Sequence, residues 1–111
     1  MNNTFTAPME LWQGLLSEIE LTQYQSDLEI HAQILGIQVK RHTYELVSNQ
    51  HSLTLQDAIK GLRKGTFNAI QLCYDYDNRV WCDTLLKRNQ GFALIRSYGL
   101  IQGLYNYYSA A

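Results

Sequence analysis

The residues of this chain that could do chemistry lie closest together between Cys73 and Asp83. If Asp77 and Asn78 form a two-residue turn, Cys73 and Cys82 face each other on adjacent strands. They then occupy a non-hydrogen-bonded site, where Cα atoms are about 4.5 Å apart, a distance that a disulfide can bridge. Because no export signal is present, a reducing compartment is the default. We therefore favour two free thiols, with a regulatory disulfide as the alternative.

A metal or cofactor site is not expected. His31, His42 and His51 lie on three different segments, and no pair of His or Cys residues stands at a ligand spacing. Zinc sites need several such ligands, usually in short spaced motifs. A Cys–His nucleophilic pair stays open, because the partners of such a pair meet only in space. The prediction is no metal and no cofactor.

Asp83 follows Trp81 by two residues on a face that we expect to be buried. A buried carboxylate without partners is costly, so it needs hydrogen-bond donors or a cation. The cationic candidates are Arg79, Lys87 and Arg96. We favour a structural ion pair, or a strand register that leaves Asp83 exposed. A ligand-binding or enzymatic pocket near Trp81, Cys82 and Asp83, between the sheet and the helices, is the alternative.

Short basic clusters raise the question of nucleic-acid binding. They are Lys40-Arg41-His42, Arg63-Lys64 and Lys87-Arg88. A sheet that stacks single-stranded bases combines such charges with aromatic side chains. The glycine–aromatic signature of those sheets is missing, and the net charge is −1. Nucleic-acid binding is therefore the third-ranked function, behind a protein partner and a pocket.

An aromatic segment after Tyr98 offers an interaction surface. Tyrosine is enriched in the cores of interfaces, and the segment is too short and too glycine-rich to hold a helix alone in water. It docks either on its own domain or on another chain. The interface candidates are Leu100, Leu104, Tyr105, Tyr107, Tyr108, Phe67, Val80 and Leu86.

An antiparallel three-stranded meander must position the central residues. Its strands are predicted at 67–76, 79–88 and 92–97. A turn at Asp77-Asn78 pairs Tyr74 with Trp81 and Leu72 with Asp83. Alternation then gives two faces. The more hydrophobic face should pack against helices and carries Ile70, Leu72, Tyr74, Tyr76, Trp81 and Leu85.

Two registers stay open for the third strand. Gly91 can supply the left-handed residue of a short loop. Pairing Arg88 with Phe92 sets Leu86 against Leu94, and pairing Asn89 with Phe92 sets Leu86 against Ile95. A slip of one residue exchanges the two faces of the strand.

Helices are expected before the meander. Leu11, Trp12, Leu15, Leu16 and Ile19 have helical spacing, and the pattern continues to a C-cap at Gly36, with a break near residues 20–26. Residues 26–36 also alternate as a strand would, although we favour helix. Residues 37–47 add a possible fourth strand. A short helix at about 55–64 starts after Thr54 and closes at Gly65.

Composition supports one domain over residues 1–111, with residues 1–6 flexible. Hydrophobic residues make up 46% and charged residues 17% of the chain. No apolar run reaches the roughly 18–20 residues that a membrane span needs, so a cytoplasmic location without membrane contact is expected. Residues 1–36 carry five acids and no Lys or Arg, whereas residues 37–66 carry a net +3. The acidic segment should lie against the basic one, with head-to-tail association as the alternative.

These patterns predict an α+β fold. One or two N-terminal helices and a short helix pack on one face of a three- or four-stranded antiparallel meander, and the C-terminal aromatic segment docks on it. The expected function is a small protein-interaction or regulatory module that acts as a homodimer. We lean against an enzyme, because no catalytic motif stands out.

Overall fold

A computed structural model describes residues 10–42, 45–47 and 53–99 of the chain. Its elements are β1 (Glu10–Leu16), α1 (Glu18–His31), β2 (Gln33–His42), β3 (Glu45–Val47), α2 (Leu55–Lys64), β4 (Ala69–Tyr76), β5 (Arg79–Arg88) and β6 (Gly91–Gly99). The expected flexible start and the aromatic segment from residue 100 onward lie outside the described residues.

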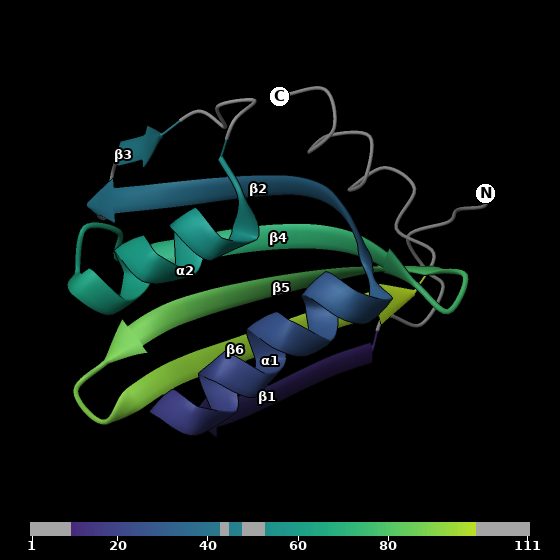
Figure 1. Cartoon of the computed structure of the whole chain (residues 1–111), viewed down its shortest axis with the longest axis horizontal. Coiled ribbons are helices and arrows are strands. Elements are labelled where there is room, and N and C mark those ends of the chain that lie inside the picture. Colours follow the sequence, from purple (N-terminus) through teal and green to yellow (C-terminus); the bar gives the residue numbers. More distant parts are fainter. Residues whose placement is uncertain (1–9, 43–44, 48–52, 100–111) are drawn as a thin grey trace, which may run out of the picture.

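The fold is α+β, as predicted, but its sheet is larger than expected. Six strands are joined in the order β1-β6-β5-β4-β2-β3, and every pairing is antiparallel. Both helices lie on one face of this sheet (Figure 1). α1 crosses the half that contains β1 and β6, and α2 crosses the half that contains β2 and β4 (Figure 1). The prediction of three or four strands was too low because the chain before the meander supplies strands on both of its sides.

The central hairpin follows the predicted register. Asp77 and Asn78 have positive φ angles of 56° and 61°, as a primed two-residue turn requires. Tyr74 consequently pairs with Trp81, and Cys73 pairs with Cys82. The face chosen for the helices is also correct, since Ile70, Leu72, Tyr74 and Leu85 are buried in the core and Trp81 packs against it. Tyr76, at the end of that face, is 47% exposed.

The third strand has neither of the two registers left open by the sequence. Arg88 pairs with Gly91, which sets Leu86 against Ala93. The loop is therefore only Asn89-Gln90, and Gly91, with φ 126°, is the first residue of β6. Close approach explains the glycine, because a Cβ at Gly91 would lie 2.5 Å from the carbonyl oxygen of Leu16 in β1.

The prediction of a helix at the start of the described chain was wrong. Residues 10–16 form β1, which pairs with β6 along its whole length. Helix α1 begins only after Ser17, whose hydroxyl accepts from the Glu20 amide at 3.1 Å while the Ser17 amide donates to Glu20 Oε1 at 2.8 Å. This capping box defines the start of the helix. Ile19, which the helical stripe included, is 72% exposed.

The ambiguous segment at 26–36 divides into two elements. α1 runs without a break to His31, and β2 starts at Gln33. Gly36 is not a helix cap: it lies inside β2, where the pairing with β4 shifts register between Ile34 and Gly36. The bulge returns Ile37 to the helix-covered face, where it is buried. The possible fourth strand in residues 37–47 is present as the greater part of β2 and as β3.

The short helix after Thr54 was predicted correctly. The Thr54 hydroxyl accepts from the Asp57 amide at 3.0 Å, and Gly65 ends α2 with a left-handed φ of 83°. Gly61 lies on the buried side of this helix, and a Cβ there would overlap the ring of Phe67. The two helices close the core with their apolar stripes. The stripe residues are Leu21, Tyr24 and Leu28 of α1 and Leu55, Ala58, Ile59 and Leu62 of α2.

Candidate functional site

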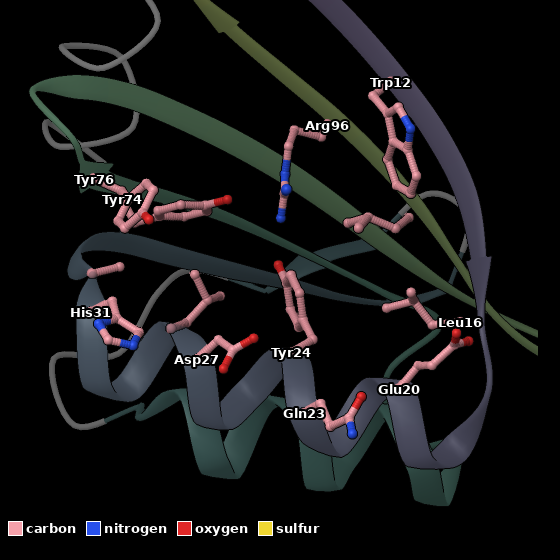
Figure 2. A pocket seen from close by; sticks show the side chains of 13 residues that line it. Trp12, Leu16, Glu20, Gln23, Tyr24, Asp27, His31, Tyr74, Tyr76 and Arg96 are labelled. Carbon is pink, nitrogen blue, oxygen red and sulfur yellow. The ribbon is translucent and has the colours of Figure 1, made fainter.

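An open groove of about 510 Å³ lies between α1 and the sheet. Figure 2 shows the residues that line it, with Leu16 and Glu20 at one end and His31 and Tyr76 at the other. The lining residues are Trp12, Leu16, Glu20, Gln23, Tyr24, Asp27, Leu28, His31, Ala32, Tyr74, Tyr76, Leu94 and Arg96. The groove has a size typical of small-ligand sites, which combine an apolar lining with a few polar groups.

The helical wall of the groove follows from residue spacing on α1. Glu20, Tyr24, Asp27 and His31 recur every three or four residues and so share one face of the helix. Tyr24 is buried and points toward the sheet, whereas Glu20, Asp27 and His31 are exposed along the opening (Figure 2). The capping box at Ser17 determines where the helix begins, and the contact of Tyr24 with Asp83 of the sheet determines which side of the helix faces the groove.

The sheet wall follows from alternation along β1 and β6. Trp12 pairs with Arg96, and Leu16 pairs with Phe92. Gly14 stands between the two β1 residues on the same face, and a Cβ there would overlap the Trp12 indole. The indole therefore lies across the glycine, while 52% of Trp12 remains exposed. The indole of Trp12 thus provides an exposed aromatic surface that lines the groove.

A buried carboxylate organises the floor of the groove. Asp83 is 1% exposed and receives four hydrogen bonds. Arg96 donates from Nε to Oδ1 and from Nη2 to Oδ2, each at 3.0 Å. The hydroxyls of Tyr24 and Tyr74 donate to Oδ2 at 2.7 Å and 2.9 Å. The structural ion pair expected for Asp83 is confirmed, with Arg96 as its cation.

The two phenols and the guanidinium that surround Asp83 each stay in one protonation state near neutral pH. Burial raises the pKa of the Tyr24 phenol well above its ordinary value, and the charge of Asp83 and the hydrogen bond to it raise it further. The pKa of the Tyr74 phenol is raised in the same way, first by burial and then by the charge of Asp83. Burial alone would lower the pKa of Arg96, but its hydrogen bonds and charge attraction to Asp83 outweigh burial and raise it. Both phenols therefore remain donors, and the guanidinium remains charged.

The Trp81 ring contacts the Arg96 guanidinium of this cluster. The guanidinium carbon of Arg96 lies 5.7 Å from the centre of the Trp81 ring, within the range of a cation–π contact. The indole Nε1 donates to the carbonyl oxygen of Tyr76 at 2.9 Å. Arg96 is therefore held both by its hydrogen bonds to Asp83 and by the Trp81 ring, which restricts its side chain to the floor of the groove.

The structure separates the three pocket candidates. Trp81 and Asp83 both contact Arg96, which lines the groove. Cys82 lies on the opposite face of the sheet, as alternation along β5 requires. It is joined to Cys73 in a disulfide, with the Cα atoms 4.3 Å apart. The structure thus departs from the favoured interpretation of two free thiols, because the directly paired positions bring the two sulfur atoms together.

The interface candidates do not form one surface among the described residues. Leu100, Leu104, Tyr105, Tyr107 and Tyr108 lie outside the described part of the chain. Phe67 packs against the core beside Gly61, on the helix-covered side. Val80 and Leu86 lie on the other face of the sheet and are partly buried.

The basic clusters lie away from the groove. Arg63 of α2 pairs with Glu18 of α1 at 2.9 Å, which fits the expectation that acidic and basic segments meet within one chain. Lys87 Nζ donates to the Arg63 carbonyl at 2.6 Å. Arg96 is the single Lys or Arg among the groove residues.

Sequence reasoning missed the helical wall and Trp12. The signal for the wall is the Ser-x-x-Glu pattern at 17–20, which marks a helix start and sets Tyr24 and Asp27 on one face. The signal for Trp12 is its spacing of two from Gly14 and four from Leu16, which suits the inner face of a strand. Neither pattern reveals that Tyr24 meets Asp83, 59 residues later in the chain.

Searches against protein-family models, curated proteins and solved structures found no match to this chain. Within the described residues, no group of three His, Cys, Asp or Glu side chains could hold a metal ion. The helices in that part of the chain are also too short or too polar to cross a membrane. The site is therefore interpreted from its own geometry.

Proposed function

We propose that this protein is a non-catalytic binding protein whose ligand occupies the groove between α1 and the sheet. The observation that supports this most is the groove itself: about 510 Å³ of open space beside a half-exposed Trp12 and above the Asp83–Arg96 cluster. An apolar surface with a few preorganised polar groups is the usual composition of a small-ligand site.

Binding is favoured over catalysis by the state of the polar cluster. A general acid or base works best with a pKa near the working pH. Burial and the charge of Asp83 raise the pKa of the Tyr24 and Tyr74 phenols far above that pH. Asp83 is occupied by four donors and shielded from the groove by the side chains that hold it. These groups are suited to holding a rigid surface in place.

A fragment screen by amide NMR on the full chain tests this function. Compounds that bind should shift the amides of groove residues such as Gln23, Asp27 and Leu94. Gln23→Trp, which fills the opening from α1, should abolish the shifts. Ser26→Trp adds the same bulk on an exposed α1 position outside the groove and should leave them unchanged. Shifts that map elsewhere, or that survive Gln23→Trp, would overturn the proposal.

A homodimeric protein-interaction module is the second candidate, and edge strand β1 favours it. β1 is at the end of the strand order, so its outer edge has no partner strand among the described residues. Trp12 and Leu15 are 52% and 57% exposed along it. Edge strands can pair with a strand from another chain.

Light scattering after size-exclusion chromatography tests the second candidate. A dimer that forms through β1 should become a monomer with Leu15→Lys, because a charged edge disfavours strand pairing. A chain that ends before Leu100 tests the aromatic segment separately, since it removes Leu104, Tyr105, Tyr107 and Tyr108 while keeping β1. A monomeric full-length protein at all concentrations would exclude the homodimer.

A further inference from the structure

We infer that the groove selects an organic cation: a protonated amine or guanidinium group attached to an apolar body. The inference rests on the proposed binding function and specifies its ligand class. It comes from three features of the groove, which are its charge balance, its aromatic lining and the contacts that already engage Arg96.

The charge balance of the groove is negative. Arg96 is its one cationic Lys or Arg side chain, and that charge is matched by the Asp83 carboxylate, whose nearest atoms lie 3.0 Å away. Glu20 and Asp27 add two carboxylates along α1, and the lining, which also includes His31, holds no second Lys or Arg to match them. Charges that line a partly enclosed site act through a lower dielectric than bulk water, so their attraction for a cation is increased.

Asp27 is the carboxylate best placed for direct contact with a ligand. One oxygen of Glu20 accepts from the Ser17 amide in the capping box, so Glu20 is partly held in place by the helix start. Asp27 is exposed, and Figure 2 shows it between Tyr24 and His31 on the groove side of α1. Its replacement should leave the helix intact.

Aromatic side chains complete the environment that a cation prefers. Trp12 and Tyr76 line the opening and are 52% and 47% exposed. Cations bind to the faces of such rings, and tryptophan binds them most strongly. The rings of Tyr24 and Tyr74 line the interior while their hydroxyls donate to Asp83. The apolar body of the ligand would lie among Trp12, Leu16 and Leu94.

An anionic ligand is the competing possibility, since Arg96 is a common anion-binding residue. Here the guanidinium uses Nε and Nη2 for Asp83 and lies against the Trp81 ring. An anion would therefore compete with a buried carboxylate and would also meet Asp27 and Glu20. A cation encounters neither obstacle.

Three probes of matched shape test the inference by titration calorimetry or amide NMR on the full chain. Phenethylamine carries a cation, 2-phenylethanol is neutral, and 3-phenylpropionate carries an anion. Phenethylamine should bind most tightly, and its affinity should fall as NaCl is raised because salt screens the attraction. The affinity of 2-phenylethanol should not respond to salt.

Variants localise the effect. Asp27→Asn should weaken phenethylamine by about three- to fivefold, as expected for a partly exposed ion pair, and should leave 2-phenylethanol unaffected. Trp12→Leu should weaken the cation more than the neutral probe. Asp75→Asn is the matched control, because Asp75 is an exposed carboxylate of β4 that does not line the groove.

The source of the cation is distinguished by two peptides, acetyl-Lys-Phe-amide and its norleucine analogue. Tighter binding of the lysine peptide than of phenethylamine indicates a side chain of a partner protein, and the reverse order indicates a free amine. If 2-phenylethanol or 3-phenylpropionate binds the groove at least as tightly as phenethylamine, the inference is wrong although the groove remains a binding site. If no probe binds while other fragments occupy the groove, the inference is also wrong.

Discussion

Asp83 and Arg96 are direct cross-strand partners on β5 and β6, and their side chains meet in two parallel hydrogen bonds of 3.0 Å. The carboxylate is 1% exposed, so the pair replaces water on the inner face of the sheet. Tyr24 extends the pair to α1 through its 2.7 Å hydrogen bond. One ion pair therefore connects the two walls of the groove.

Removal of the carboxylate charge should destabilise the fold strongly. Asp83→Asn leaves the Arg96 guanidinium partly buried without a counterion, and we expect a loss of about 3–5 kcal/mol in the free energy of unfolding. Urea denaturation followed by circular dichroism measures this loss. The control is Asp75→Asn at an exposed site, where a change within about 0.5 kcal/mol is expected.

A variant that removes the whole cluster, Asp83→Leu/Arg96→Leu/Tyr24→Phe/Tyr74→Phe, provides an independent check if Asp83→Asn is too unstable to purify. It removes the unpaired charge together with the two hydroxyls that would otherwise lose their acceptor, so it should be more stable than Asp83→Asn. A loss of less than about 1 kcal/mol for Asp83→Asn would show that the Asp83–Arg96 ion pair does not stabilise the fold as expected.

Stability should fall when the pH rises above that at which an exposed phenol ionises. Folding raises the pKa of Tyr24 and Tyr74 above their ordinary value of 10.0. The native state therefore retains protons that the unfolded state releases, and the associated stability is complete below pH 10 and is lost above it. Each phenol contributes a slope of about 1.4 kcal/mol per pH unit in that range.

Urea denaturation at a series of pH values from 8 to about 11.5 measures this slope. Tyr24→Phe should reduce the slope by about one proton, even though the variant is less stable at neutral pH. Tyr76→Phe removes an exposed phenol that makes no hydrogen bond to Asp83 among the described contacts and serves as control. Equal slopes for wild type and Tyr24→Phe would contradict the role assigned to burial and Asp83.

Gly61→Ala should destabilise α2 although alanine is the better helix former. The intrinsic preference favours alanine by about 1 kcal/mol, but a Cβ at Gly61 would overlap the Phe67 ring. Displacement of a ring in a packed core costs about 1–3 kcal/mol, so a net loss is expected by thermal or urea unfolding.

The second variant in this series is Gly61→Ala/Phe67→Leu. The smaller side chain makes room for the new methyl group, so Gly61→Ala should be less harmful, or stabilising, in the Phe67→Leu background. Lys60→Ala, on the exposed side of the same helix, controls for helix propensity. A gain of stability from Gly61→Ala in the wild-type background would show that Phe67 does not pack as described.

Reduction of the Cys73–Cys82 disulfide should lower stability moderately. The bond closes a short loop, for which the chain-entropy estimate is roughly 2–3 kcal/mol. The Asp77-Asn78 turn already restricts that loop, so we expect the lower part of this range or less. Urea denaturation with and without a phosphine reductant measures the difference, and thiol titration reports the redox state directly.

Cys73→Ser/Cys82→Ser separates reduction from other effects of the reductant, because this variant should not respond to it. The groove should keep its ligand affinity on reduction, since the disulfide lies on the opposite face of the sheet from Arg96. Two reactive thiols in the unreduced protein, or no change of stability on reduction, would favour the free thiols that the reducing-compartment argument predicted.

Local patterns accounted for the central hairpin and α2. Asp77 and Asn78 tolerate the positive φ that the turn requires, and a two-residue turn leaves one register for Tyr74 and Trp81. Thr54 and Gly65 mark the ends of α2 by hydrogen bonding and by a left-handed φ. In each case the residues that decide the structure are neighbours in sequence, so the amino-acid order contains the necessary information.

The same local reasoning failed where apolar residues suit both helix and strand. Leu11, Trp12, Leu15 and Leu16 have helical spacing, yet β1 forms because β6 offers it a partner strand. The register of the third strand was undecided for a related reason, because Leu94 and Ile95 are equally apolar. In the structure Arg88 pairs with Gly91, and the backbone of β1 passes close to Gly91.

The sequence alone determined the mixed class of the fold, the hairpin and the need of Asp83 for a cation, because these follow from turn chemistry, alternation and the cost of burying charge. Only the tertiary structure identified Arg96, among three candidates, as the cation of Asp83. The contact of Tyr24 with the same carboxylate and the groove beside Trp12 also became apparent only in the structure. Those outcomes depend on how α1 crosses the sheet, and the packing of distant elements sets that crossing.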